Sequence, residues 1–299
     1  MKKFVFPLKR PFLFFLFFLL FSTIVVVPAP RAQEKRGLVR GLVLLLMPLD
    51  SPSVMYGRFL PFKRYLEGRL GIPVKLKVAK KRSEVIETLE KGQADLAFLC
   101  PTLYCLASRR IPIVPLAKLR VNGSSQYRSV LLVRNDSGIK KISDLAGRTF
   151  VYGRFYCPGS GLLPDMILRG AGVHESDLMD TVRLGSDESA VLAVMARLFD
   201  ATGVSEITAR PYLGKGLRIL GYSRPIPQYL FAARGGMDRN LLRRIKAAML
   251  FVNSLKSRKD VLGGIEPGAD GLADAHDRDY DIVRKLIRED PDRPGMFRP

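Results

Sequence analysis

Residues 91–110 read KGQADLAFLCPTLYCLASRR, and this stretch decides which fold the chain adopts. Gly92 is suited to end a helix, and the compact run Ala94–Leu99 has the length and composition of a strand that is buried on both faces. Pro101–Thr102 then opens a new helix, with Thr102 as its cap and Tyr104 on its first turn. Such a turn lies at the carboxyl end of a parallel strand, where open α/β sheets bind their ligands.

The same alternation of strands and helices is found before this stretch. A strand is expected at Gly41–Met47, a helix at Ser53–Leu70, a strand at Pro73–Val78 and a short helix at Ser83–Lys91. This order predicts an α/β fold in which a parallel sheet carries helices on both faces.

A second set of strands and helices follows. Apolar patterns predict strands at Tyr127–Arg134, Arg148–Tyr152, Thr181–Leu184 and Leu198–Val204, and helices at Gly161–Arg169 and Ser186–Arg197. The segment Leu217–Ala233 reads as extended, and from Asp238 onward the chain reads as helical. The helix expected at Asp238–Leu255 has an apolar face that needs a core to cover, so we expect it to pack on the first half of the chain.

The N-terminus has the three parts of an export signal. Residues 1–10 carry basic side chains, Phe12–Val27 is apolar apart from a Ser-Thr pair, and the small residues and prolines of VPAPRAQ follow. We interpret residues 1–32 as a signal peptide that is cleaved after Ala32. The length of the apolar run leaves a retained membrane anchor as the alternative.

The chain is strongly basic. Its formal net charge is +21, and removing the five basic residues of the signal leaves +16. The Lys and Arg residues are scattered and form no long run of the kind found in nucleic-acid-binding arms, so no nucleic acid is expected as a partner. A positive field of this kind attracts small anions.

Cysteine and histidine offer little to catalysis or metal binding. The three cysteines are Cys100, Cys105 and Cys157, so an exported chain keeps at least one free thiol, and we expect all three to act as small buried residues. Cys100 and Cys105 flank a turn and are not expected to bridge. The two histidines are far apart in the sequence, and neither a GxSxG motif nor a nucleotide-binding loop occurs. We therefore predict no enzyme, no cofactor and no metal site.

Four predicted helix starts carry a hydroxyl group or a glycine where a strand leads into a helix. They lie at Ser51–Ser53, Thr102, Ser160–Gly161 and Ser186. The first turn of a helix has free backbone N–H groups that bind oxyanions. Each of these starts is an ordinary N-cap by itself, but two in each half of the chain together indicate an anion held between two lobes.

The chain resembles the phosphate, phosphite and phosphonate-binding family of periplasmic receptors of ABC transporters. The resemblance covers residues 38–288 and rests on the order and spacing of several segments: SPS at 51–53, ADLAFLCPTLY at 94–104, SDLAGRTFVY at 143–152, GSGLLP at 159–164, GSDESAVLAV at 185–194 and FDATGV at 199–204. It implies a type II periplasmic-binding fold, in which two α/β lobes joined by two crossover strands surround a ligand cleft. Lobe one is expected to contain residues 38–125 and 224–299, and lobe two residues 126–223.

Carrying the family's ligand-contacting positions over to this sequence yields a set of candidate residues. They are Ser53 or its neighbour Tyr56, Tyr104, Tyr127, Arg128, Ser160, Gly161, Ser186, Asp187 and Asp200. Arg154 is added because it could supply charge to an anion bidentately. Tyr104 is expected to face the cleft. The backbone N–H groups of Gly161 and Leu162 are expected to form the anion site of lobe two together with Ser160.

The sequence departs from the family's pattern at two places. Phosphonate receptors commonly have a run of hydroxyl residues where this chain has Pro158–Gly161, and they commonly have His where this chain has Asp187. A carboxylate there repels a dianion. Asp187 therefore points away, pairs with Arg154 or Arg128, or the ligand is not a phosphonate. We expect a small anion other than a simple alkylphosphonate, with a second end that is basic or donates hydrogen bonds.

The resemblance implies a monomeric, periplasmic solute-binding protein. It would deliver a small phosphonate-like or phosphate-like anion to an ABC permease in the inner membrane. One alternative is a sensor of the same fold that docks a membrane receptor kinase. Another is a membrane-anchored scaffold, which a retained signal would favour.

Overall fold

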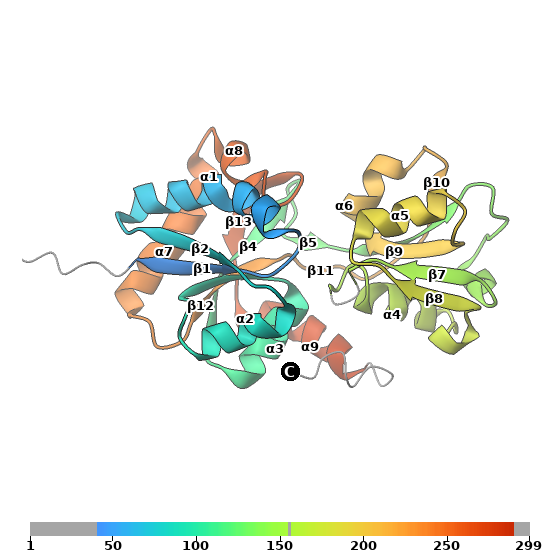
Figure 1. Ribbon diagram of the computed structural model, residues 1–299, viewed down its shortest axis with the longest axis horizontal. Coiled ribbons are helices and arrows are strands. Elements are labelled where there is room, and N and C mark those ends of the chain that lie inside the picture. Colours follow the sequence, from blue (N-terminus) through green and yellow to red (C-terminus); the bar gives the residue numbers. More distant parts are fainter. Residues whose placement is uncertain (1–40, 155–156, 290–299) are drawn as a thin grey trace, which may run out of the picture. The chain divides into compact units, whose positions relative to one another are not determined.

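Two separate mixed β-sheets form the framework of this protein, as seen in a computed structural model (Figure 1). The structure describes residues 41–154 and 157–289 of the 299-residue chain. Both sheets belong to one compact unit, residues 39–299. The predicted signal peptide, and the retained anchor that is its alternative, lie outside the described residues.

The first sheet has six strands in the order β13-β4-β12-β3-β1-β2. Strands β1, β2 and β3 are parallel, whereas β12 runs antiparallel between β3 and β4, and β13 pairs antiparallel with β4. Their bounds are β1 Leu42–Leu46, β2 Val74–Val78, β3 Leu96–Leu99, β4 Ile113–Val121, β12 Leu230–Arg234 and β13 Ala269–Asp274. The sheet thus combines strands from the beginning and the end of the described chain.

Helices cover both faces of this sheet (Figure 1). One face carries α1 (Pro52–Leu70), α7 (Arg239–Phe251) and α8 (Arg258–Leu262), and the other carries α2 (Arg82–Glu90), α3 (Pro101–Arg110) and α9 (Asp281–Arg288). The apolar face of α1 holds it on the sheet. Phe62 of this helix is fully buried, and its ring stacks on Phe231 of β12 with 4.6 Å between the ring centroids. Helix α7 packs against the same core through Ile245 and Met249, as its apolar face predicts.

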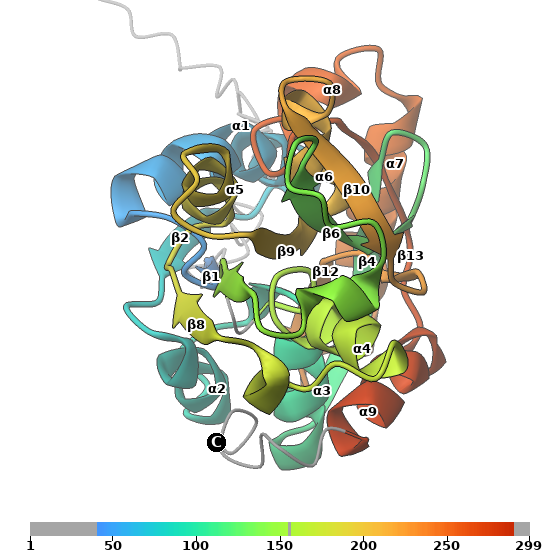
Figure 2. The same cartoon turned by 90° about the vertical axis from the view of Figure 1, so that its right-hand side faces the viewer.

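The second sheet has five strands in the order β10-β6-β9-β7-β8. Strand β7 is parallel to β8 and β9, whereas β6 runs antiparallel to β9 and β10. Their bounds are β6 Ser129–Arg134, β7 Thr149–Tyr152, β8 Asp180–Arg183, β9 Ala201–Ser205 and β10 Leu217–Tyr222. Helix α4 (Leu162–Gly170) covers one face, and α5 (Asp187–Met195) and the short α6 (Glu206–Ala209) cover the other (Figure 2).

Two segments of chain connect the sheets. The chain passes from β4 of the first sheet to β6 of the second, and it returns between β10 and β12. The short strands β5 (Gln126–Tyr127) and β11 (Ile226–Pro227) pair antiparallel where the two segments run together. Two sheets joined by two crossing segments match the architecture that the resemblance implies. The residue boundaries of the two lobes stay a prediction.

Two strands differ from the sequence-based expectation. No strand is expected at β4, where Pro115 and charged residues interrupt the apolar pattern, and β13 lies in a stretch that reads as helical. Both strands form because β4 pairs with β12 on one side and with β13 on the other. One cap also differs: Cys100, not Thr102, is the N-cap residue of α3. The expected cap Ser186 is confirmed, because its hydroxyl accepts a hydrogen bond from the Ser189 N–H.

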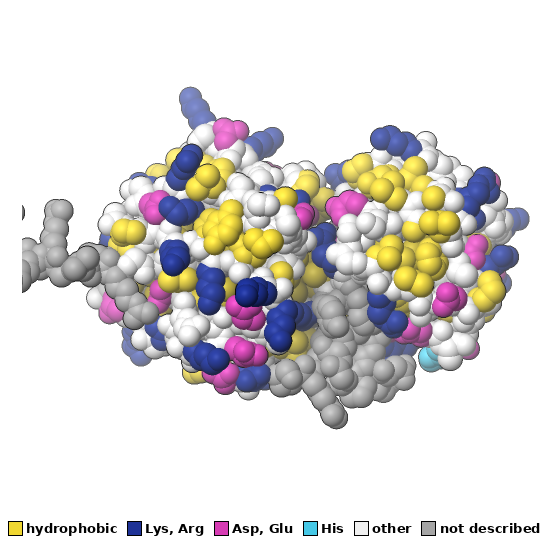
Figure 3. Space-filling model, in the orientation of Figure 1, with side chains coloured by type: hydrophobic (Ala, Val, Ile, Leu, Met, Phe, Trp, Pro, Cys, Tyr) yellow, Lys and Arg dark blue, Asp and Glu magenta, His cyan; other side chains and the backbone are white. Residues whose placement is uncertain are grey.

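The outer surface shows dispersed charge. On the face drawn in Figure 3, Lys and Arg side chains are spread out with acidic and neutral side chains among them. Within residues 41–154 and 157–289, no helix combines the length and the apolar character that crossing a bilayer requires.

Truncation of Phe62 tests the packing of α1. Because the ring is fully buried against Phe231, Phe62→Ala should lower the free energy of unfolding by about 3–5 kcal/mol. The control Leu198→Ala alters a side chain that is 70% exposed and should change it by less than about 0.5 kcal/mol. Urea denaturation measures both values, and equal losses would contradict the packing described.

Candidate functional site

A cavity of about 260 Å³, here called the polar cavity, opens where the crossing segments meet loops from both sheets. The turn after β1 contributes Leu49 and Asp50, and the crossing segments contribute Tyr127, Gln228 and Tyr229. The chain after β7 contributes Arg154, Cys157, Gly159 and Ser160. The start of α5 contributes Asp187 and Glu188, whereas Arg58 and Glu266 complete the charged part of the wall.

Three buried polar groups on this wall lack hydrogen-bond partners within the described part of the chain. They are the hydroxyl groups of Tyr127 and Ser160 and the Nε2 amide of Gln228. Ser160 is 1% exposed and Gln228 is 3% exposed. Buried polar groups in native proteins are almost always hydrogen-bonded, because leaving one unpaired costs about 1–3 kcal/mol. Three such groups on one wall can donate together to a ligand rich in oxygen atoms.

Arg154 joins the two sides of the polar cavity. Its guanidinium donates to the backbone carbonyl of Leu49 at 2.7 Å and lies 3.4 Å from the Asp187 carboxylate. The backbone N–H of Arg154 also donates to Asp187, at 2.7 Å. Of the alternatives left open by the sequence, the pairing of Asp187 with Arg154 is therefore the one that the structure contains. Arg128 lies instead near Glu206, at 3.9 Å.

Gly153 makes room for this pairing. A Cβ atom added at Gly153 would lie 2.3 Å from the Asp187 Oδ1 atom and 2.8 Å from the Asp187 Cα atom. Real side chains do not approach that closely, so only glycine lets the backbone before Arg154 pass the start of α5.

The polar cavity has more acids than bases on its wall. The wall has only two guanidinium groups, those of Arg58 and Arg154. Its four acidic side chains are those of Asp50, Asp187, Glu188 and Glu266. Burial raises the pKa of Glu266 to about 7, although the charge of Arg154 opposes the shift and that of Asp187 adds to it. Even with Glu266 neutral, the remaining acids outnumber the two bases, which is unfavourable for a simple dianion.

Several candidate residues from the sequence do not line the polar cavity. Ser53 is exposed beside Ser51, and the Tyr56 hydroxyl donates to the Leu76 carbonyl. Ser186 caps α5, and Asp200 accepts hydrogen bonds from the backbone and hydroxyl of Thr149. The structure brings four of the candidates together on the wall of the polar cavity: Tyr127, Arg154, Ser160 and Asp187.

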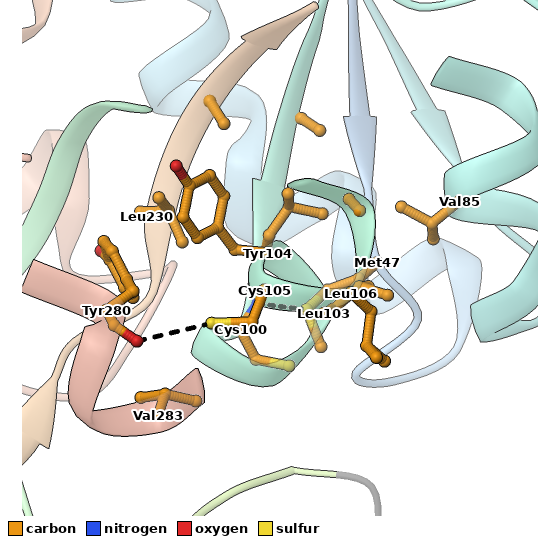
Figure 4. Close-up of a cluster of buried hydrophobic side chains, with 14 of the residues drawn as sticks. Met47, Val85, Cys100, Leu103, Tyr104, Cys105, Leu106, Leu230, Tyr280 and Val283 are labelled. Atoms are coloured by element: carbon orange, nitrogen blue, oxygen red, sulfur yellow. Dashed lines mark hydrogen bonds between the residues drawn. The ribbon is translucent and has the colours of Figure 1, made fainter. Parts of the chain in front are cut away.

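Tyr104 differs most from its expected position. It is fully buried in the apolar cluster between α3 and α9, where its ring lies 4.8 Å from that of Tyr280 (Figure 4). Its hydroxyl donates to the Asp277 carboxylate at 2.6 Å. Burial and this carboxylate raise the pKa of Tyr104. The ring therefore belongs to the core of the first sheet and does not face the polar cavity.

The chain before α4 also differs from its expected role. The N–H groups of Ser160 and Gly161 both donate to the carbonyl of Cys157, at 3.2 and 3.0 Å. The Gly161 N–H is thus occupied by a local turn and is not the anion-binding donor that we expected. Ser160 reaches the polar cavity through its hydroxyl instead.

Sequence reasoning missed Gln228, Glu266 and Arg58. Gln228 stands at the end of the run SRPIPQ, where a polar residue in an extended apolar segment is the only signal. Glu266 follows α8 in a stretch that reads as helical, and nothing local marks it. No group of His, Cys, Asp and Glu side chains suited to a metal ion occurs among the residues that the structure describes.

Comparison with known proteins provides an independent line of evidence. A model of the family described as ABC transporter, phosphonate, periplasmic substrate-binding protein matches residues 44–280. The phosphate-import protein PhnD of Mycolicibacterium smegmatis is 24% identical over 283 residues, which cover 86% of this chain and 88% of that protein.

Solved structures share the fold. PhnD1 from Prochlorococcus marinus in complex with methylphosphonate has a TM-score of 0.73 at 18% identity, covering 83% of this chain and 97% of that one. A binding protein component of an ABC phosphonate transporter from Pseudomonas aeruginosa has a TM-score of 0.69 at 18% identity, covering 82% and 85%. The fold is thus the type II periplasmic-binding fold, as the resemblance implies.

Substitution of Tyr104 tests its placement in the core. Tyr104→Ala should lower the free energy of unfolding by about 3–5 kcal/mol because it empties a buried ring site. Tyr104→Phe keeps the ring and loses only the hydrogen bond to the Asp277 carboxylate, so it should lose about 1.5–3 kcal/mol. Thermal and urea denaturation measure both losses. Weakened ligand binding by Tyr104→Phe, with stability unchanged, would place the hydroxyl in the ligand site instead.

The raised pKa of Glu266 predicts a pH dependence of stability. Its pKa is about 7 in the folded protein against an ordinary value of 4.5, so the unfolded chain releases this proton first as the pH rises. The folded state then binds more protons, and its stability falls across that interval. Glu266→Gln should remove this fall. The free energy of unfolding of the variant should therefore rise relative to that of the wild type between about pH 5 and about pH 8. A stability difference that does not change with pH would contradict the burial of this carboxyl group.

Proposed function

The chain belongs to the phosphonate family of periplasmic substrate-binding proteins of ABC transporters, and from this premise we propose that it captures a phosphonate-type anion in the polar cavity for a membrane permease. The observation that carries the proposal is the set of unpartnered donors on Tyr127, Ser160 and Gln228. Hydrogen bonds from neutral donors can hold an oxyanion without bringing further charge. Export by residues 1–32 into the periplasm is part of this proposal.

The charges on the wall favour a ligand with two different ends. The phosphonate end would take the three neutral donors and the positive charge of Arg154. A second end that carries an ammonium group or another hydrogen-bond donor would face Glu266 and Asp187. Opposite charges at both ends offset the desolvation of each group, whereas a plain dianion would lie near these carboxylates without a positive charge to offset them.

The contacts across the polar cavity support a cycle of closing and opening. We propose that residues 38–125 with 224–299, and residues 126–223, are two lobes that close on the ligand. Arg154 donates to Leu49 across them, and Cys157 and Leu162 join the apolar cluster that includes Leu103. Closure of hinged domains around ligands is a common switching motion, and the closed form would dock the permease as a monomer.

Calorimetric titration of the mature protein tests the ligand class. We would titrate phosphate, phosphite, methylphosphonate and 2-aminoethylphosphonate under one set of conditions. The aminoethyl compound should bind most tightly, and Glu266→Gln should weaken its binding while leaving methylphosphonate binding unchanged or improved. Tight binding of methylphosphonate with no advantage for the amine would overturn the two-ended ligand, and no binding of any of the four would overturn the phosphonate class.

Removal of one donor tests the location of the site. Ser160→Ala should weaken binding of the preferred anion about tenfold to a hundredfold, because a hydrogen bond to a charged group contributes about 1.5–3 kcal/mol. The control Ser254→Ala removes an exposed hydroxyl that bonds only to the local Phe251 carbonyl among the contacts described and should leave affinity unchanged. Equal affinities for both variants would place the anion site elsewhere.

A further inference from the structure

A second cavity, of about 490 Å³, lies beside the polar cavity and is here called the arginine cavity. Its wall contains three arginines, Arg82, Arg154 and Arg183. Of the described residues that line it, within 41–154 and 157–289, none is acidic. Arg154 lines both cavities, so they share part of one wall. Because carboxylates outnumber guanidinium groups only in the polar cavity, the two adjoining spaces differ in the sign of the charge that they favour.

The arginine cavity lies where parallel strands of both sheets end. In the first sheet, Met47 directly follows β1, and Arg82 opens α2, the helix that follows β2. In the second sheet, Arg154 lies shortly after β7, and Arg183 is the last residue of β8. Open α/β sheets bind their ligands at the carboxyl ends of parallel strands. The arginine cavity therefore occupies a position at which this class of sheet binds ligands.

Contacts within the protein hold the three arginines in place. Arg82 donates to the Thr102 hydroxyl at 3.1 Å, and Arg183 donates to the Glu175 carboxylate at 2.5 Å. Arg154 bridges the two sides of the polar cavity as described above. Side chains that are positioned before a ligand arrives lose less conformational entropy when they bind it. Since a guanidinium is planar, always charged and able to pair bidentately with a carboxylate, this wall suits a ligand that carries a carboxylate.

The rest of the wall is mainly apolar. Met47, Pro48 and Leu49 line it from the turn after β1, and Leu184 lines it from the chain after β8. Cys157, which is buried as the sequence predicts, lies on the wall as well. Pockets of about 300–1,000 Å³ that combine apolar walls with a few placed polar groups bind organic molecules. A bare inorganic anion would leave this apolar surface uncovered, so the wall favours an anion with an apolar body.

We propose that the arginine cavity is a second binding site, which takes an organic acid with one carboxylate group and an apolar body. The carboxylate binds among the guanidinium groups, and the apolar body covers Met47, Leu49 and Leu184. This site goes beyond the proposed function, because an acid bound here does not require a phosphonate in the polar cavity. The two proposals can therefore fail separately.

Calorimetric titration of the mature protein with octanoate tests the ligand class. Two further probes separate the contributions of charge and body: 1-octanol keeps the apolar chain without the charge, and acetate keeps the carboxylate without the chain. Octanoate should bind at least about tenfold more tightly than either, because both the charged and the apolar contacts contribute. No octanoate binding, an equal affinity for 1-octanol, or an equal affinity for acetate would each overturn the proposal.

Substitution of Arg183 locates the site. Its side chain is 40% exposed, so Arg183→Gln should leave the fold intact, and it should weaken octanoate binding about tenfold. The matched control Arg197→Gln removes an exposed guanidinium that also contacts a carboxylate, that of Asp136, but does not line the arginine cavity. The control should leave octanoate affinity unchanged, and thermal denaturation establishes that both variants are folded. Equal effects of the two substitutions would indicate general attraction to a basic protein and would overturn the site.

Ser160→Ala distinguishes the two cavities, because Ser160 lines the polar cavity and not the arginine cavity. This variant should bind octanoate as tightly as the wild type. Octanoate binding that is weakened by Ser160→Ala and unaffected by Arg183→Gln would place the acid in the polar cavity and overturn the second site. Octanoate binding that depends on Arg183, in a protein that binds none of the phosphonates, would support the second site and refute the proposed function alone.

Discussion

The pairing of Arg154 with Asp187 is the interaction on which the candidate site depends. Both groups are largely withdrawn from water, so each needs the other to offset its desolvation. Asp187 accepts from the backbone as well as from the guanidinium of Arg154, and it thereby fixes the direction of the chain after β7. The remaining donor capacity of Arg154 reaches Leu49 after β1. A single ion pair thus positions the wall of the second sheet against that of the first.

The closeness of an apolar cluster and a polar cavity follows from this arrangement. Cys157 belongs to the cluster that includes Cys100 and Leu103, yet Ser160, only a turn away, turns its hydroxyl to the polar cavity. Apolar contact across the two sheets stabilises their approach, and the polar wall is where a ligand can satisfy buried donors. In the proposed function, the same loop would therefore serve both the closure of the lobes and the recognition of the ligand.

The polar cavity differs from a binding site for a simple anion because its wall has more carboxylates than guanidinium groups. The chain is strongly basic, but the wall of the polar cavity has more acidic than basic side chains. The charge of the whole protein acts on a ligand from a distance, whereas the charges of the wall act on it only at short range. The overall positive charge draws an anion toward the surface. In the proposed function, Glu266 and Asp187 would then favour an anion that also carries a positive or hydrogen-donating group, since desolvated charges interact strongly over short distances.

The sequence by itself determined the alternation of strands and helices and the parallel order of β1, β2 and β3. It also indicated the family, and with it Tyr127, Ser160 and Asp187 as candidate site residues. These follow from local patterns, because hydrophobic periodicity and caps act over a few residues. Only the tertiary structure decided that β4 and β13 are strands, since their hydrogen-bond partners lie far away in the chain. It also decided that Tyr104 turns toward Asp277 and that Glu266 and Gln228 reach the cavity. The direction in which such a side chain points depends on which element from elsewhere in the chain packs against its own. A local sequence pattern does not contain that information.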